Sequence, residues 1–193
     1  MRSLLLALML CGTGWAGFCT ASSEVDQKRH DFEFFGGYSP GTATLIGTAT
    51  DRQFIVAGFS YGYRCWAWEH ASISYDAGVM PAAILIEPTH SVYGVAVTPL
   101  GFTLEFRPRG RLHPFAELVG GLIASTEPIP YTGPDATGLN FLFDLGGGLR
   151  WDLSETRAIT VGYKYLHISN AFTTDFNPGI DNNIIFIGYS FLR

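Results

Sequence analysis

The sequence has little charge. Lys, Arg, Asp and Glu make up 15% of its 193 residues, whereas a soluble globular domain carries about 25%. Hydrophobic residues account for 47%, aromatic residues for 15%, and glycine occurs 23 times. The formal net charge is −5 and the sequence has no basic tract, so nucleic-acid binding has no support. This composition is unlike that of a typical cytosolic protein.

Long apolar runs are also missing, except at the N-terminus, so the sequence offers no transmembrane helix beyond it. There, Arg2 supplies a positive charge, Leu4 to Leu10 form an apolar core, and Cys19-Thr20-Ala21 suits cleavage before Ser22. A retained anchor helix is the weaker alternative because the apolar core is short. We therefore predict a cleaved signal peptide over residues 1–21 and one domain over 22–193.

Metal-ligand spacing is absent as well. His30, His70, His90 and His113 are scattered along the chain without the clustering that a metal site requires. Gly146-Gly147-Gly148 lies inside a strand pattern, where glycines mark close packing or a bend rather than a phosphate loop. We expect neither a metal nor a cofactor.

The chain does show alternation of apolar and polar residues, which is typical of β-strands. The clearest strand runs from Leu139 to Trp151, and a second runs from Arg157 to Ser169. Less regular versions bring the number of predicted strands to eight. They run from Asp31 to Tyr38, Arg52 to Tyr63, Trp66 to Asp76, Tyr93 to Arg107, His113 to Ser125 and Asn183 to Phe191. Most are near the ~9–11 residues that a tilted strand needs to cross a membrane.

The connections alternate between short and long. Short turns are expected around residues 64–65, 108–112 and 152–156, and longer loops over 39–51, 77–92, 126–138 and 170–182. This pattern predicts an all-β fold, an eight-stranded antiparallel transmembrane β-barrel with short periplasmic turns and longer external loops. With both termini periplasmic, the seventh strand ends at the cell surface.

Charged residues are expected on the inner face of this barrel. They are Glu69, Glu105, Asp144, Arg150 and Lys164. A channel is one interpretation, but eight strands leave room only for side chains, which favours a packed interior of paired charges. Trp66, Trp68 and Trp151 are expected outside, near the short turns, as an aromatic girdle.

One constellation has the residue types of a serine hydrolase. His167 and Ser169 are two apart on a strand and therefore share a face, and Asp181 follows a short loop later. A base beside the hydroxyl and a third group that orients the base are what activate a serine. Asn170 offers an amide to a developing oxyanion. A polar residue of the membrane interface is the alternative interpretation of His167.

The C-terminal segments resemble the lipid A 3-O-deacylase (PagL) family, whose members are often labelled acyloxyacyl hydrolases. The resemblance is carried by the segments Gly162–Ala171, Asn177–Asp181 and Ile187–Phe191, and the strand Phe141–Arg150 also fits. The N-terminal half resembles the family only in its strand pattern. The resemblance implies an eight-stranded outer-membrane barrel with a histidine, serine and acidic triad on its outer surface.

The resemblance also implies a reaction and roles for the site residues. Ser169 is then the nucleophile, His167 the general base, Asn170 an oxyanion contact, and Asp181 takes a position where the family commonly has glutamate, with Asp175 as the alternative acid. The ester at position 3 of lipid A in lipopolysaccharide is the implied substrate. Its acyl chain is expected along the outward stripe that includes Tyr165. Phe172 and Phe176 in the following loop either cover the chain or anchor the protein at the membrane interface.

The expected surroundings are the lipids of the outer membrane, with the site facing the outer leaflet, and a homodimer remains open. Two rival functions stay open at this point. One is a non-catalytic outer-membrane barrel with a structural or adhesion role. The other is a soluble, secreted lipocalin-like barrel with an apolar ligand inside, against which the inward charges argue.

Overall fold

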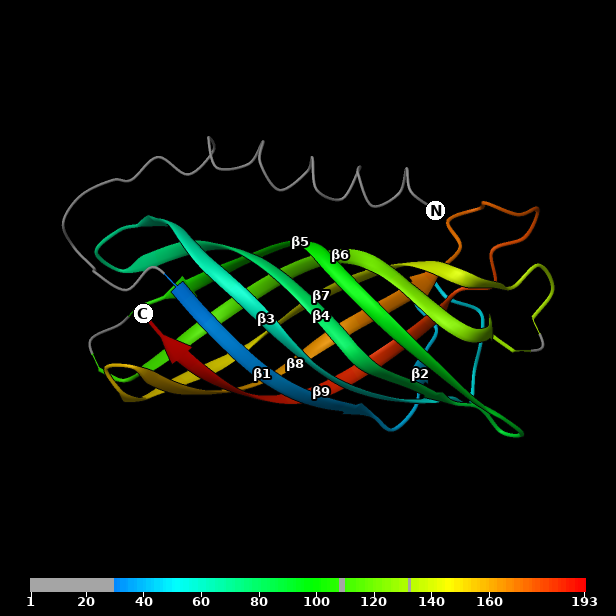
Figure 1. Cartoon of the computed structure of the whole chain (residues 1–193), viewed down its shortest axis with the longest axis horizontal. Coiled ribbons are helices and arrows are strands. Elements are labelled where there is room, and N and C mark those ends of the chain that lie inside the picture. The colour runs from blue at the N-terminus through cyan, green and yellow to red at the C-terminus, as the bar shows by residue number, and fades with distance from the viewer. Residues whose placement is uncertain (1–29, 108–109, 132) are drawn as a thin grey trace.

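A computed structural model describes residues 30–107, 110–131 and 133–193 of the chain. The predicted signal peptide lies outside these residues. Within them, eight long strands form one antiparallel sheet that closes on itself, as predicted (Figure 1). They are β1 (His30–Ser39), β3 (Gln53–Ala67), β4 (Ala71–Ile86), β5 (Ser91–Phe106), β6 (Leu112–Ile129), β7 (Thr137–Ser154), β8 (Arg157–Ser169) and β9 (Ile180–Leu192). The described part of the chain has no helix with the length and apolar character to cross a membrane.

The barrel closes between its first and last long strands. β1 pairs with β9 from Asp31 opposite Leu192 to Tyr38 opposite Ile185. The backbones of His30 and Arg193 add two hydrogen bonds of 2.9 Å at the end of this seam. A two-residue strand, β2 (Thr42–Ala43), also pairs with β9, beyond the end of β1. Closure gives each of the eight long strands in the described residues a partner on both sides, as lipid surroundings require.

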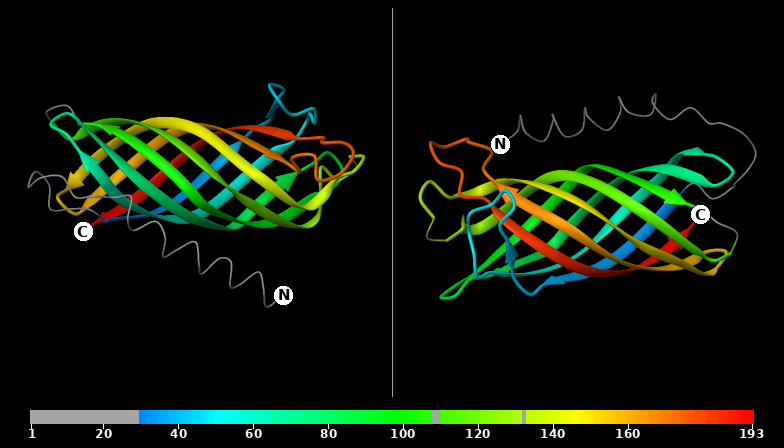
Figure 2. Two further views of the ribbon diagram at one scale, coloured as in Figure 1. Left: turned by 90° about the horizontal axis from the view of Figure 1, so that it is seen from above. Right: turned by 180° about the vertical axis from the view of Figure 1, so that it is seen from behind.

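Three longer connections and one tight turn gather at one end of the barrel, and the C-terminus lies at the other end with the short turns (Figures 1 and 2). The longer connections cover residues 40–52, 130–136 and 170–179. The two ends of the barrel are called the loop end and the turn end below.

Two predicted connections are wrong. The long loop expected over 77–92 is a tight turn in which the Glu87 amide donates to the His90 carbonyl at 2.8 Å. β4 continues through Gly78 and Pro81 because register shifts next to both residues absorb them. Likewise, residues 64–65 lie within β3 at a register shift, and the turn is at residues 68–70.

The corrected turn also overturns one predicted inward residue. Glu69 lies in this turn and its side chain is 85% exposed. The other four predicted inward charges, Glu105, Asp144, Arg150 and Lys164, do face the interior and pair there. This pairing fits the packed-interior interpretation, because a buried charge without a partner is strongly unfavourable.

The outer face of the barrel is apolar. Large hydrophobic side chains are exposed along β1, β3, β5, β6, β7, β8 and β9, among them Phe34, Tyr93, Leu139, Trp151 and Ile185. Such a continuous apolar surface is far larger than that of a soluble monomer and fits contact with lipid. This observation argues against the soluble lipocalin-like alternative.

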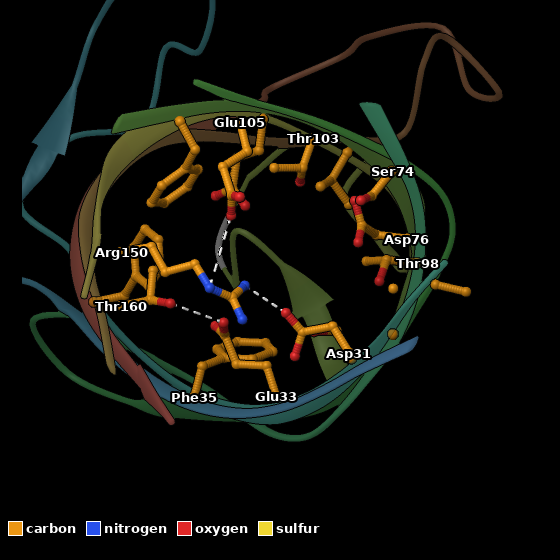
Figure 3. A pocket seen from close by; sticks show the side chains of 18 of the residues that line it. Asp31, Glu33, Phe35, Ser74, Asp76, Thr98, Thr103, Glu105, Arg150 and Thr160 are labelled. Atoms are coloured by element: carbon orange, nitrogen blue, oxygen red, sulfur yellow. Dashed lines mark hydrogen bonds and ion pairs between the residues drawn. The ribbon is translucent and has the colours of Figure 1, made fainter. Parts of the chain in front are cut away.

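The interior has two layers. An apolar cluster fills the half nearest the loop end, with Phe54, Leu85, Ile123, Leu166 and Ile168 at its centre. A polar layer fills the half nearest the turn end and surrounds a cavity (Figure 3). There, Arg150 forms ion pairs with Asp31 at 2.5 Å and Glu105 at 3.7 Å, and Lys164 pairs with Glu117 at 2.9 Å and Asp144 at 3.6 Å.

We predict that Lys164→Ala destabilises the barrel by about 3–5 kcal/mol, because it leaves two buried carboxylates without their cation. Urea unfolding in lipid vesicles measures the change. Arg157→Ala, at an exposed position of the same strand, is the control and should change stability by about 0.5 kcal/mol or less. Equal stability of the two variants would contradict the ion-pair interpretation of the interior.

Candidate active site

His167 and Ser169 lie on the outer face of β8, near the loop end. Their partners on β7 are Phe143 and Phe141, whose side chains are exposed on the outside of the barrel. The alternate residues of β8, Leu166 and Ile168, are buried in the apolar cluster. The outward direction of His167 and Ser169 is therefore fixed by the burial of their neighbours, because side chains alternate along a strand.

Asp181 meets His167 across the β8–β9 pair. The two residues are direct partners in the register, and Nδ1 of His167 lies 2.7 Å from Oδ1 of Asp181. Aspartate therefore reaches the imidazole although it is one methylene shorter than glutamate. A proton on Nδ1 leaves Nε2 as the acceptor nitrogen of the ring, which is the form a general base requires. Asp175, the alternative acid, lies exposed in the following loop.

The other oxygen of Asp181 accepts three backbone hydrogen bonds. The amides of Leu45, Ile46 and Gly47 donate to Oδ2 at 2.8, 2.8 and 2.9 Å. They come from the connection between β1 and β3, and Asp181 itself is fully buried. No sequence signal points to these donors, because no side chain or local spacing links residues so far apart in the chain.

Gly179 packs against the His167 ring. It adopts a φ of +48°, and a Cβ added there would lie 3.1 Å from Cε1 of His167. Glycine is therefore suited to this position on two grounds, the left-handed backbone and the close approach of the ring.

Asn170 shapes the loop after β8. Its side-chain nitrogen has acceptors in the Thr174 hydroxyl at 2.7 Å and in the Phe176 and Asp135 carbonyls at 3.0 and 3.1 Å. Its side-chain oxygen accepts from the Phe172 amide at 2.9 Å. The structure thus directs the Asn170 amide into the loop. Ala171 and Phe172 have positive φ angles of 52° and 60°.

Asn177 is a second amide beside Ser169 that the sequence analysis did not select. Its side-chain oxygen accepts from the backbone amide of Asn170, the residue after Ser169, at 3.2 Å. This bond ties the far end of the loop to the end of β8. The segment Asn177-Pro178-Gly179 is part of the family resemblance, and the fold places Asn177 against the residue that follows Ser169.

The predicted substrate-contact residues surround this centre. Tyr165 lies two positions before His167 on the same face of β8, half-buried, opposite Asn183 on β9. Phe172 is 74% exposed in the loop after β8, and Phe176 is exposed nearby. Ser169 is buried by its surroundings. In the described part of the chain, no group of three or more residues is arranged to hold a metal ion.

Comparison with known proteins identifies a family for this chain. Residues 55–190 match the family described as lipid A 3-O-deacylase (PagL). The chain belongs to this family. The match includes β8, most of β9 and the three residues His167, Ser169 and Asp181. No curated protein is significantly similar to the chain.

Solved structures show the same fold at low sequence identity. The outer membrane enzyme PagL has a TM-score of 0.61 and 20% identity, with 82% of this chain and 97% of that chain covered. Neisserial surface protein A has a TM-score of 0.54 and 9% identity, with 84% and 96% covered. The N-terminal barrel of Pseudomonas aeruginosa OprF has a TM-score of 0.52 and 14% identity, with 86% and 100% covered. The family and the fold agree with the predicted outer-membrane location.

We predict that Gly179→Ala destabilises the protein by about 1–2 kcal/mol, since an L-residue is strained in the left-handed region. Urea unfolding in lipid vesicles measures the change in the free energy of unfolding. Gly120→Ala is the control, because a Cβ there would meet no atom closer than 3.8 Å. Wild-type stability of Gly179→Ala would show that the backbone turn at residue 179 is not required.

Proposed function

We propose that this chain is an outer-membrane serine esterase that hydrolyses the acyl chain ester-linked at position 3 of lipid A. The observation that carries the proposal is the 2.7 Å contact between His167 and Asp181, two strand positions from an outward serine. A histidine that only served as a polar interface residue would not need a fully buried carboxylate behind it. The family match supports the substrate class.

The reaction proceeds through an acyl-enzyme. The Ser169 hydroxyl oxygen attacks the ester carbonyl carbon while Nε2 of His167 takes the hydroxyl proton. Asp181 stabilises the imidazolium that forms. The tetrahedral intermediate then expels the sugar oxygen, which takes the proton from His167. Water, deprotonated by His167, hydrolyses the acyl-enzyme and releases the fatty acid and free Ser169.

The oxyanion of the tetrahedral intermediate needs a hydrogen-bond donor. Asn170 is the donor implied by the resemblance, and its side-chain amide has acceptors within the loops in this structure. Asn177 is the second candidate, because its oxygen accepts from the Asn170 amide next to Ser169 and its side-chain nitrogen is a donor. Comparison of Asn170→Ala with Asn177→Ala distinguishes the two.

The substrate reaches this site laterally, from the outer leaflet of the membrane. Val161, Tyr163 and Tyr165 precede His167 on the outward face of β8, and Ile185 and Ile187 on β9 are exposed beside them. An acyl chain along this apolar stripe would place its ester near Ser169. The exposed ring of Phe172 lies in the loop that follows Ser169, where it can cover the chain.

We predict that Ser169→Ala and His167→Ala each lower deacylation by about 10³-fold or more, because the members of such a triad act as a unit. The measurement is the mass of lipid A from a host that carries 3-O-acylated lipid A. The wild type should remove one 3-acyl chain, and both variants should leave it in place. Ser154→Ala, at the turn end of the barrel, is the control.

Lipid A of unchanged mass in the presence of folded wild-type protein would refute the proposed reaction. That result would favour the non-catalytic barrel, which predicts that neither Ser169→Ala nor His167→Ala has any effect.

We also predict that Phe172→Ser raises KM for a long-chain ester about tenfold and leaves kcat nearly unchanged. Loss of a buried aromatic contact costs about 1–3 kcal/mol of substrate binding. Phe106→Ser removes an exposed aromatic ring at the turn end and should leave both constants unchanged. A fall in kcat at constant KM would assign Phe172 to the shape of the loop rather than to substrate binding.

A further inference from the structure

We infer that residues 45–47, within the connection between β1 and β3 (residues 40–52), form a positioning element of the active site. Its amides at Leu45, Ile46 and Gly47 hold the Asp181 carboxylate at the one place where it meets His167. The inference rests on the proposed function, since it assigns a catalytic purpose to this connection.

The two carboxylate oxygens of Asp181 have separate partners. Oδ1 lies against Nδ1 of His167, and Oδ2 accepts all three backbone amides. Successive backbone amides that converge on one point form an anion-binding concavity. Because Asp181 is fully buried, the amides replace the water that a carboxylate otherwise requires. They also prevent the carboxylate from turning away from His167.

The connection is itself anchored on both sides of these amides. Before them, Thr42 and Ala43 of β2 pair with Asn182 and Asp181 of β9. After them, the Thr48 amide donates to the Pro178 and Gly179 carbonyls, both at 3.1 Å. The Thr48 hydroxyl also donates to the Pro178 carbonyl. Residues 44–47 are thus held against the segment that carries Asp181 and packs on His167.

Gly47 lies where this connection is closest to the site. A Cβ added at Gly47 would lie 2.8 Å from the Gly179 carbonyl oxygen and 3.0 Å from the Asp181 amide nitrogen. Both neighbours are backbone atoms, so alanine at this position must displace the connection. The displacement would withdraw the amides from Asp181 and loosen its contact with His167.

The same geometry suits the length of an aspartate side chain at position 181. The amides fix the carboxylate at the reach of an aspartate side chain. A glutamate would extend the carboxylate by about 1.5 Å, one carbon–carbon bond. It would then overlap the amides or the imidazole. Asp181→Glu is therefore expected to lower kcat in this chain.

The deciding experiment compares Gly47→Ala with Gly41→Ala in the full barrel, in detergent micelles with 3-O-acylated lipid A. A Cβ at Gly41 meets no atom within 4 Å, so this variant alters the same connection without displacing it. Gly47→Ala should lower kcat by about 10²-fold, the effect of a 1 Å misplacement, with KM unchanged. Gly41→Ala should match the wild type. In an Asp181→Asn background, Gly47→Ala should have no further effect.

A second measurement does not depend on turnover. In protein labelled with ¹⁵N-histidine, the Nδ1 proton of His167 that is bonded to Asp181 gives a downfield NMR signal, assigned by its loss in His167→Gln. Gly47→Ala should shift or remove this signal, and Gly41→Ala should preserve it.

The outcomes separate the two proposals. An active wild type with an equally active Gly47→Ala overturns the positioning role and leaves the proposed function intact. The positioning role is also overturned if Gly47→Ala lowers activity by the same factor in the Asp181→Asn background as in the wild type. An inactive wild type overturns the proposed function. The NMR signal then tests the contact between His167 and Asp181 independently of activity. An unchanged signal in Gly47→Ala overturns the inference.

Discussion

Pairing of the backbone in a closed sheet is the constraint on which the rest of this structure depends. A strand in lipid must satisfy every amide and carbonyl within the protein, and here β1 meets β9 to complete the circle. Closure divides the side chains of each strand between an interior and an outer surface. The interior of eight strands must be filled, so the outer surface is where a large lipid substrate can meet the protein.

The two layers of the interior serve the site in different ways. The apolar cluster lies directly behind the site. Its members Leu166 and Ile168 point inward, so His167 and Ser169 point outward. The ion pairs of Arg150 and Lys164 lie nearer the turn end. Buried charges behind the site would act electrostatically on the His167–Asp181 pair. The cluster behind the pair is apolar, and the backbone amides of residues 45–47 donate directly to Asp181.

Alternation in the sequence predicted the closed barrel, the outer face of His167 and Ser169, and the approach of Asp181 to their level. These features follow from local periodicity and from strand count. The turn positions were harder, because β-bulges at Pro81 and near Cys65 let strands continue through residues that resemble breaks. The amides that hold Asp181 were beyond prediction, since any residue supplies a backbone N–H and only the folded path brings this one segment to the site.

The support of Asp181 also depends on closure of the barrel. His167 and Asp181 come from neighbouring strands near the C-terminus and can meet within one hairpin. The amides of residues 45–47 follow the first long strand and reach Asp181 only when β1 has joined β9. Closure of the barrel between β1 and β9 therefore also brings these amides to Asp181. A partly assembled chain holds the serine and histidine without a fixed acid behind them.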